Sequence, residues 1–143
     1  MQKTGLFAKL GVAAAVAMGG LALVSQPAAF AAAAPAFSVT PATGLSDGAS
    51  VTASATGAAA GEQITILQCA TVKDQLACNP ATVKTVAADA AGSASTSFVV
   101  NKGFQAVTPD GAAVGSVDCA VTACYVSAGS PNGLLGSTQL SFR

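Results

Sequence analysis

Residues 63–80 read QITILQCATVKDQLACNP, and this stretch carries the strongest structural signal in the chain. Its first part alternates isoleucine with threonine or leucine, which is the two-residue period of a β-strand, and it predicts a strand over Gln63–Cys69. Because Leu67 is also apolar, the second side of this strand is unusually apolar. We therefore expect the strand either to lie deep in a sandwich of sheets or to line a pocket.

The rest of the chain after residue 33 has the same character. Short runs of β-branched and small polar residues are broken by turn residues about every ten positions, and no helical period is present. The predicted strands are Ala36–Thr40, Ser50–Thr56, Gln63–Cys69, Val83–Ala88, Ser93–Val100, Val114–Asp118, Cys124–Ser127 and Thr138–Phe142. Strands of this length without a covering helix predict two antiparallel sheets packed face to face, an all-β immunoglobulin-like sandwich.

The four cysteines form two local pairs along the chain, Cys69 with Cys78 and Cys119 with Cys124. Four cysteines allow three connectivities, and their spacing does not choose among them. Pairing within each local pair is the simplest arrangement if each pair brackets a turn between antiparallel strand segments. A zinc site would need CxxC knuckles or histidine ligands, and the chain has neither, so no metal is expected.

The first 33 residues have the form of a signal peptide. Lys3 and Lys9 supply a positive head, the run Leu10–Val24 is apolar, and small residues follow. A membrane anchor is the alternative, but this run is shorter than the roughly 20 residues that span a bilayer. Cleavage after Ala31 or Ala33 is expected, and the second site leaves a secreted, extracellular domain of residues 34–143, where disulfides persist.

Composition narrows the possible functions of this domain. Without Lys3 and Lys9, the domain has four basic and six acidic residues, a net charge of 4 − 6 = −2. The polypeptide itself is therefore not expected to bind DNA. The chain has no histidine to act as a base and no GxSxG motif, and its few carboxylates are scattered, so an enzyme is not expected. An adhesive or structural module and a carrier of a small hydrophobic molecule remain open.

Five blocks of the sequence are distinctive in their order along the chain: Phe37–Gly48, Gln68–Ala70, Ala77–Ala81, Ala88–Ser95 and Val114–Cys119, with Cys124 following. Together they resemble the neocarzinostatin family of enediyne chromoproteins. The resemblance implies a secreted, monomeric, seven-stranded sandwich with two disulfides, whose cleft holds a nine-membered enediyne chromophore without a covalent bond. It further implies an antitumour and antibacterial antibiotic in which the chromophore cleaves DNA, while the apoprotein stabilises and delivers it and has no membrane partner.

The resemblance also implies where the chromophore binds. The Cys69–Cys78 disulfide would form part of the cleft floor, and the second disulfide would join Cys119 to Cys124. The implied ligand-binding residues are Gln68, Thr71, Leu76, Val83, Phe104, Val107, Pro109, Tyr125 and Gly129. Phe104 fits a core anchor as well as a cleft wall, whereas the ring and polar tip of Tyr125 suit a partly polar ligand.

Four of these positions depart from neocarzinostatin itself. Thr71, Val83, Val107 and Pro109 stand where that protein has aromatic residues. The chain looks nearer to the actinoxanthin and C-1027 apoprotein branch of the family, which also has a proline on the loop of Pro109. A different enediyne from that of neocarzinostatin is therefore expected.

Overall fold

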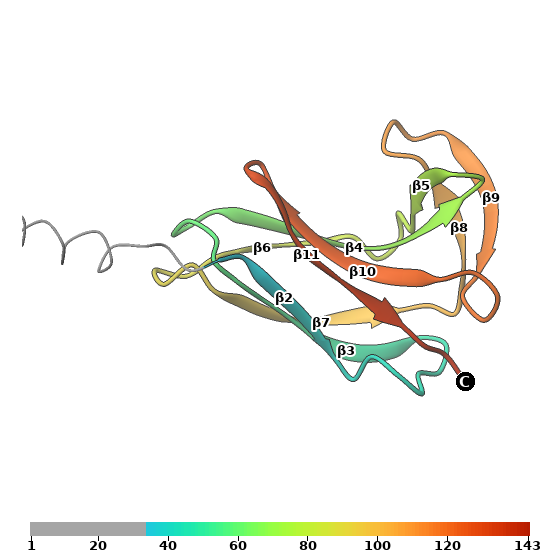
Figure 1. Cartoon of the computed structure of the whole chain (residues 1–143), viewed down its shortest axis with the longest axis horizontal. Coiled ribbons are helices and arrows are strands. Elements are labelled where there is room, and N and C mark those ends of the chain that lie inside the picture. Colours follow the sequence, from blue (N-terminus) through green and yellow to red (C-terminus); the bar gives the residue numbers. More distant parts are fainter. Residues whose placement is uncertain (1–33) are drawn as a thin grey trace, which may run out of the picture. The chain divides into compact units, whose positions relative to one another are not determined.

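The computed structural model describes residues 34–143, and the predicted signal peptide lies outside them. Within this range the chain forms strands and turns without a helix, so it offers no helix that could cross a membrane. Its strands pair in two antiparallel sheets (Figure 1). The predicted all-β antiparallel sandwich is confirmed.

The smaller sheet has three strands, in the order β2 (Ala36–Thr40), β3 (Ala49–Thr56) and β7 (Ala94–Val100). Alternation decides which side faces the core, because successive side chains of a strand point to opposite faces. Val51 of β3 and Phe98 of β7 are buried. The other face carries hydroxyls, and the Oγ atoms of Ser50 and Ser97 lie 2.8 Å apart.

The larger sheet has seven strands around the long central strand β4 (Gln63–Val72). The order is β11 (Gly133–Leu140), β10 (Cys124–Ser130), β4, β5 (Gln75–Cys78), β8 (Gly103–Val107) and β9 (Ala113–Asp118), and β6 (Lys84–Ala87) also pairs with β4. β6 pairs with the first part of β4, and β5 pairs with its last four residues. β4 therefore belongs to the sandwich at one end and to a separate arm of β5, β8 and β9 at the other (Figure 1).

Buried apolar side chains form two clusters. The larger cluster lies between the sheets, where Ile64 and Ile66 of β4 pack with Val126 of β10 and Phe98 of β7. The second cluster lies under the arm and consists of Ala70, Ala77, Ala106, Val117, Cys119 and Cys124. Small residues dominate this second cluster and bury little apolar surface. The stability of the arm therefore depends on the disulfides more than the stability of the sandwich does.

The strands differ most from the predicted ones in three places. Residues 34–143 contain ten strand segments, and β5 and β8 were not predicted. β5 was missed because the β4–β5 turn consists of Lys73 and Asp74, with φ of 51° and 65°, in place of the asparagine and glycine that usually mark such turns. β11 begins at Gly133, five residues before the predicted start at Thr138, and pairs with β10 as far as Ser130.

Both disulfides join the local pairs. Cys69 and Cys78 are directly opposite each other in the β4–β5 ladder, with Cα atoms 3.9 Å apart. Cys119 and Cys124 have Cα atoms 5.5 Å apart and bracket the turn between β9 and β10. The local connectivity, one of the three possible, is therefore the one the chain adopts.

Candidate functional site

A cleft of about 520 Å³ opens on the face of β4 that points away from the core. The β10–β11 hairpin forms one wall, and β5, the segment after it and the end of β8 form the other. The lining residues are Leu67, Cys69, Leu76, Cys78, Asn79, Pro80, Val83, Val107, Thr108, Pro109, Ser127, Ala128, Gly129, Leu134 and Ser137. Figure 1 shows the hairpin and the arm of β5, β8 and β9 on opposite sides of this face.

The alternation within β4 explains why a cleft forms here. Ile64 and Ile66 point into the sandwich and are fully buried, whereas Leu67 and Cys69 point to the opposite face. Both faces of this strand are apolar, so exposing the second face to water costs free energy. Of the two alternatives that the sequence left open, the structure shows the strand lining a pocket.

The Cys69–Cys78 disulfide forms part of the cleft lining. Both cysteines lie on the cleft, and their bond ties β4 to β5. The Cys119–Cys124 disulfide lies in the second core cluster, outside the cleft lining. All four cysteines are in disulfides, so the protein presents no thiol to a bound molecule.

The cleft is uncharged and mostly apolar. Its lining contains no Asp, Glu, Lys or Arg, and its polar members are Asn79, Thr108, Ser127 and Ser137. The hydroxyl groups of Ser127 and Ser137 form a hydrogen bond with each other between β10 and β11, with Oγ atoms 2.8 Å apart. Leu76 on one wall and Leu134 on the other are 54% and 69% exposed. An open, neutral cleft with exposed leucines suits a neutral, largely apolar ligand.

The structure brings together many of the residues expected in the ligand site. Those that line the cleft are Leu76, Val83, Val107, Pro109 and Gly129. They come from three regions that are far apart in the chain, namely β5 with the segment before β6, the end of β8 with the residues after it, and β10. The remaining four expected residues lie outside the lining.

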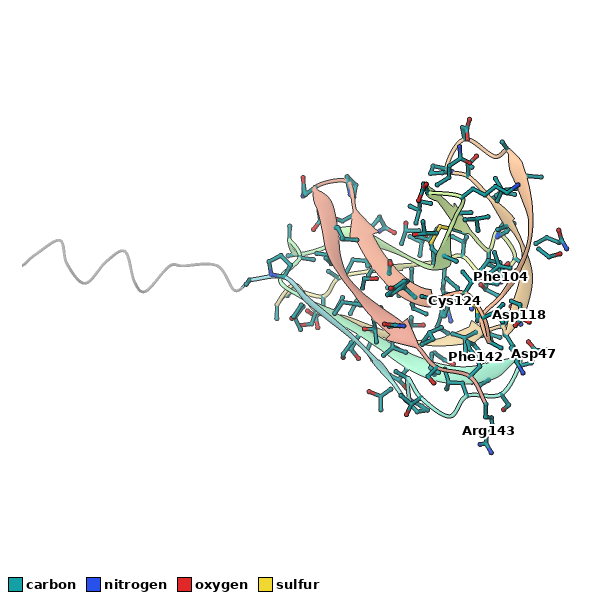
Figure 2. The ribbon with its side chains drawn as sticks, turned by 45° about the vertical axis from the view of Figure 1, so that its right-hand side comes forward. Asp47, Phe104, Asp118, Cys124, Phe142 and Arg143 are labelled. Atoms are coloured by element: carbon teal, nitrogen blue, oxygen red, sulfur yellow. A yellow bond between two sulfur atoms is a disulfide. The ribbon has the colours of Figure 1, made fainter. Side chains whose placement is uncertain are left out.

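Of those four residues, two lie on the cleft side of the sheet, and the other two pack with core residues. Thr71 and Tyr125 lie on the same side of the sheet as Cys69, since Tyr125 is opposite Cys69 in the β4–β10 ladder and Thr71 is two residues further along β4. Gln68 is fully buried and points to the other face of β4. Phe104 packs against the second core cluster, near Cys124 (Figure 2), so of its two interpretations the structure favours the core anchor.

Other lining residues were missed by the sequence interpretation. Leu67 carried a usable signal, because it made the second side of its strand apolar. Leu134 and Ser137 lie in the part of β11 that was not predicted as a strand. Asn79 and Pro80 were assigned only to a turn, and local sequence gives no sign that this turn meets the cleft.

The loop at the end of β8 contains a carboxylate whose titration should affect the cleft wall. The Thr108 hydroxyl donates to Asp110, and this hydrogen bond holds the pKa of Asp110 below its ordinary value of 3.8. Because the pKa of Asp110 is lower in the folded state than its ordinary value, the ionised carboxylate stabilises the folded turn at pH values above that ordinary pKa. This stabilisation is lost as the pH falls through the folded-state pKa. We expect acidification below about pH 3.8 to loosen the turn from Thr108 to Ala112.

NMR shifts of residues 108–112 followed against pH would measure this change. The Asp110→Asn variant is the control, because it cannot titrate, and its turn should show no step in the acid range. Titration of Asp110 at or above 3.8 in the wild type would contradict the expectation.

The fold and the cleft together define a class of protein. A small antiparallel sandwich with a neutral cleft, lined in part by a disulfide, is suited to binding a small molecule. Residues 34–143 contain no cluster of side chains that could hold a metal ion. The Neocarzinostatin family model matches residues 37–142, and the chain belongs to this family. The resemblance inferred from the sequence blocks is confirmed.

Individual relatives agree with this assignment. The chain is 56% identical over 128 residues to the antitumor antibiotic C-1027 apoprotein of Streptomyces globisporus, covering 90% of this chain and 88% of that protein. Actinoxanthin, also from Streptomyces globisporus, has the same identity and coverage. The structure of macromomycin superposes with a TM-score of 0.73 at 41% identity, covering 77% of this chain and 100% of that one.

Proposed function

We propose that this protein is the apoprotein of an enediyne chromoprotein, an antitumour and antibacterial antibiotic. It binds a labile enediyne without a covalent bond in the cleft between the β10–β11 hairpin and the arm, stabilises it and delivers it. The observation that carries this proposal is the neutral, disulfide-floored cleft with exposed leucines on both walls, in a chain of the Neocarzinostatin family.

The chemistry of the cleft supports storage of a reactive molecule. A polyunsaturated ring survives when water and nucleophiles are kept from its reactive carbons, and an apolar site does this. Thiolates are the strongest protein nucleophiles near neutral pH, and this protein has no free cysteine. The protein then needs no catalytic residue, because binding is its whole contribution.

Finer features of the proposal come from the resemblance to the family and from the composition of the chain. The bound chromophore is a nine-membered enediyne that differs from that of neocarzinostatin, and DNA is contacted only through it, since the domain carries a net charge of −2. The protein is a monomer that is secreted after removal of residues 1–33, and it is not an enzyme. An adhesive or structural module would be expected to have a filled sandwich, so the cleft favours the carrier.

Native mass spectrometry of the protein from its own culture medium, kept cold and dark, tests the proposal. We expect a mass equal to the disulfide-bonded chain plus several hundred daltons, with DNA-nicking activity in the organic extract. The protein should also absorb visible light, which its single tyrosine cannot do. A bare, colourless chain that does not bind extracted enediynes would refute the carrier function.

The exposed leucines of the two walls should contribute to affinity more than to stability. Leu76→Ala and Leu134→Ala each remove apolar contact that a ligand covers, worth about 0.8 kcal/mol per methylene. We expect each variant to bind the chromophore roughly tenfold more weakly, by titration of visible absorption, with an almost unchanged unfolding midpoint. Val121→Ala is the matched control, since Val121 is 82% exposed and outside the cleft. Equal losses in all three variants would contradict a role for the leucines in binding.

A further inference from the structure

Two serine hydroxyls on the cleft side of the sheet have a hydrogen-bonding capacity that the protein does not use up. Ser137, Ser127 and Leu67 lie directly opposite one another across β11, β10 and β4, and all three line the cleft. We propose that the Ser127–Ser137 pair determines specificity by donating a hydrogen bond to a neutral acceptor oxygen of the ligand, a carbonyl or ether oxygen. This inference rests on the proposed function, because it assigns a polar contact within the same cleft.

Strand alternation points the two hydroxyls into the cleft. Val126 and Ala128, the neighbours of Ser127 in β10, are fully buried in the cluster between the sheets, so Ser127 points to the opposite face. Ser137 points the same way, because residues directly opposite in an antiparallel ladder share a face. The next position of β10 on this face is Gly129, which has no side chain that could cover Ser127. A molecule in the cleft can therefore reach both hydroxyls.

The pair has one hydroxyl hydrogen more than its own bond uses. The two Oγ atoms are 2.8 Å apart, and either serine can be the donor. Whichever serine donates, the other keeps its hydroxyl hydrogen, for which residues 34–143 provide no further hydrogen bond. A hydroxyl that accepts a hydrogen bond is also polarised into a better donor. The accepting serine is therefore the group that gains most from an oxygen atom of the ligand.

The other polar side chains of the lining are engaged elsewhere. The single hydroxyl hydrogen of Thr108 is donated to Asp110. The amide of Asn79 donates to Asn101, whose backbone is bound by Gln68 on the core side of β4. The serine pair is thus the side-chain donor that faces the ligand.

The surroundings restrict the matching ligand group to a neutral acceptor. A ligand that covers Leu67 also covers the serines beside it and removes water from them. A hydroxyl that loses water without gaining a new partner costs free energy, so an apolar ligand group at this point is disfavoured. A carboxylate is disfavoured as well, because it would lose its hydration and the lining has no cationic side chain. A carbonyl or ether oxygen meets both conditions.

Two probes of nearly identical shape test this assignment. 2-Acetylnaphthalene has a carbonyl oxygen where 2-isopropenylnaphthalene has a CH₂ group, so the dissociation constant of the hydrocarbon divided by that of the ketone measures the contribution of the oxygen. We expect this ratio to fall roughly fivefold when Ser127→Ala and Ser137→Ala are combined in the ligand-free protein. The control combines Ser54→Ala with Ser95→Ala, which removes a serine pair with Oγ atoms 3.1 Å apart outside the cleft and should leave the ratio unchanged.

A measurement on the wild type alone covers the case in which the double variant fails to fold. The methyl protons of bound 2-acetylnaphthalene should show nuclear Overhauser effects to the β-protons of Ser127 or Ser137. A ratio that survives the double substitution, or effects only to other parts of the cleft, would overturn the assignment while leaving the cleft as the binding site. Binding of neither probe to the wild type would count against the cleft and therefore against both proposals.

Discussion

Replacing Cys69 and Cys78 together with alanine is expected to lower the free energy of unfolding by about 2–3 kcal/mol and to weaken chromophore binding by more than roughly tenfold. The stability loss is the chain entropy that a closed loop of this length removes from the unfolded state. The loss of affinity has a separate cause. The disulfide is part of the cleft lining and ties the arm to β4, and β5 otherwise contacts β4 through a ladder of only four residue pairs.

The second disulfide provides the matched control. Cys119→Ala with Cys124→Ala opens a loop of similar size, so thermal or denaturant unfolding should show a comparable loss of about 2 kcal/mol. Cys119 and Cys124 lie outside the cleft lining, and the affinity of this folded variant should fall much less. Equal affinities of the two double variants would show that the Cys69–Cys78 disulfide has no special role in the cleft.

The Phe98→Ala variant should lose about 3–5 kcal/mol of stability, a large share of the 5–15 kcal/mol available to a domain of this size. Phe98 is the largest fully buried side chain of residues 34–143, and it lies in β7 against the central cluster. Its removal leaves a cavity between the two sheets that small neighbours such as Ala53 and Ala55 cannot fill. Urea unfolding would measure the change.

The next residue of the same strand is a suitable control. Val99 points to the opposite face and is 44% exposed, so Val99→Ala should change stability by no more than about 0.5 kcal/mol. Similar losses at positions 98 and 99 would mean that this strand does not alternate between core and surface, which would contradict the sandwich.

Much of the fold could be predicted because its signals are local. The alternation in Gln63–Cys69, the regular turn residues and the paired cysteines each occupy a few neighbouring positions, and together they indicate an antiparallel sandwich. The β4–β5 turn was missed for an equally local reason, since Lys73 and Asp74 adopt positive φ without the usual turn residues.

The candidate site was only partly predictable because it joins distant segments. Leu76 and Leu134 face each other across the cleft from positions 58 residues apart, and their own sequence neighbours do not show this. Gln68 was expected beside the disulfide floor, but the adjacent Cys69 faces the cleft and Gln68 faces the core. A shift of one residue along a strand reverses the face, so closeness in sequence does not predict a shared surface.

The fold class, most of the strand segments and the family can be inferred from the chain alone, because strand period, turn chemistry and motif order are properties of neighbouring residues. Which apolar face of β4 is covered by the second sheet, and which one stays open as the cleft, depends on tertiary packing. The same packing places Asn79 and Pro80, which are turn residues in the sequence, among the residues that line the cleft. These outcomes depend on how distant strands pair and pack, and a local pattern does not encode that arrangement residue by residue.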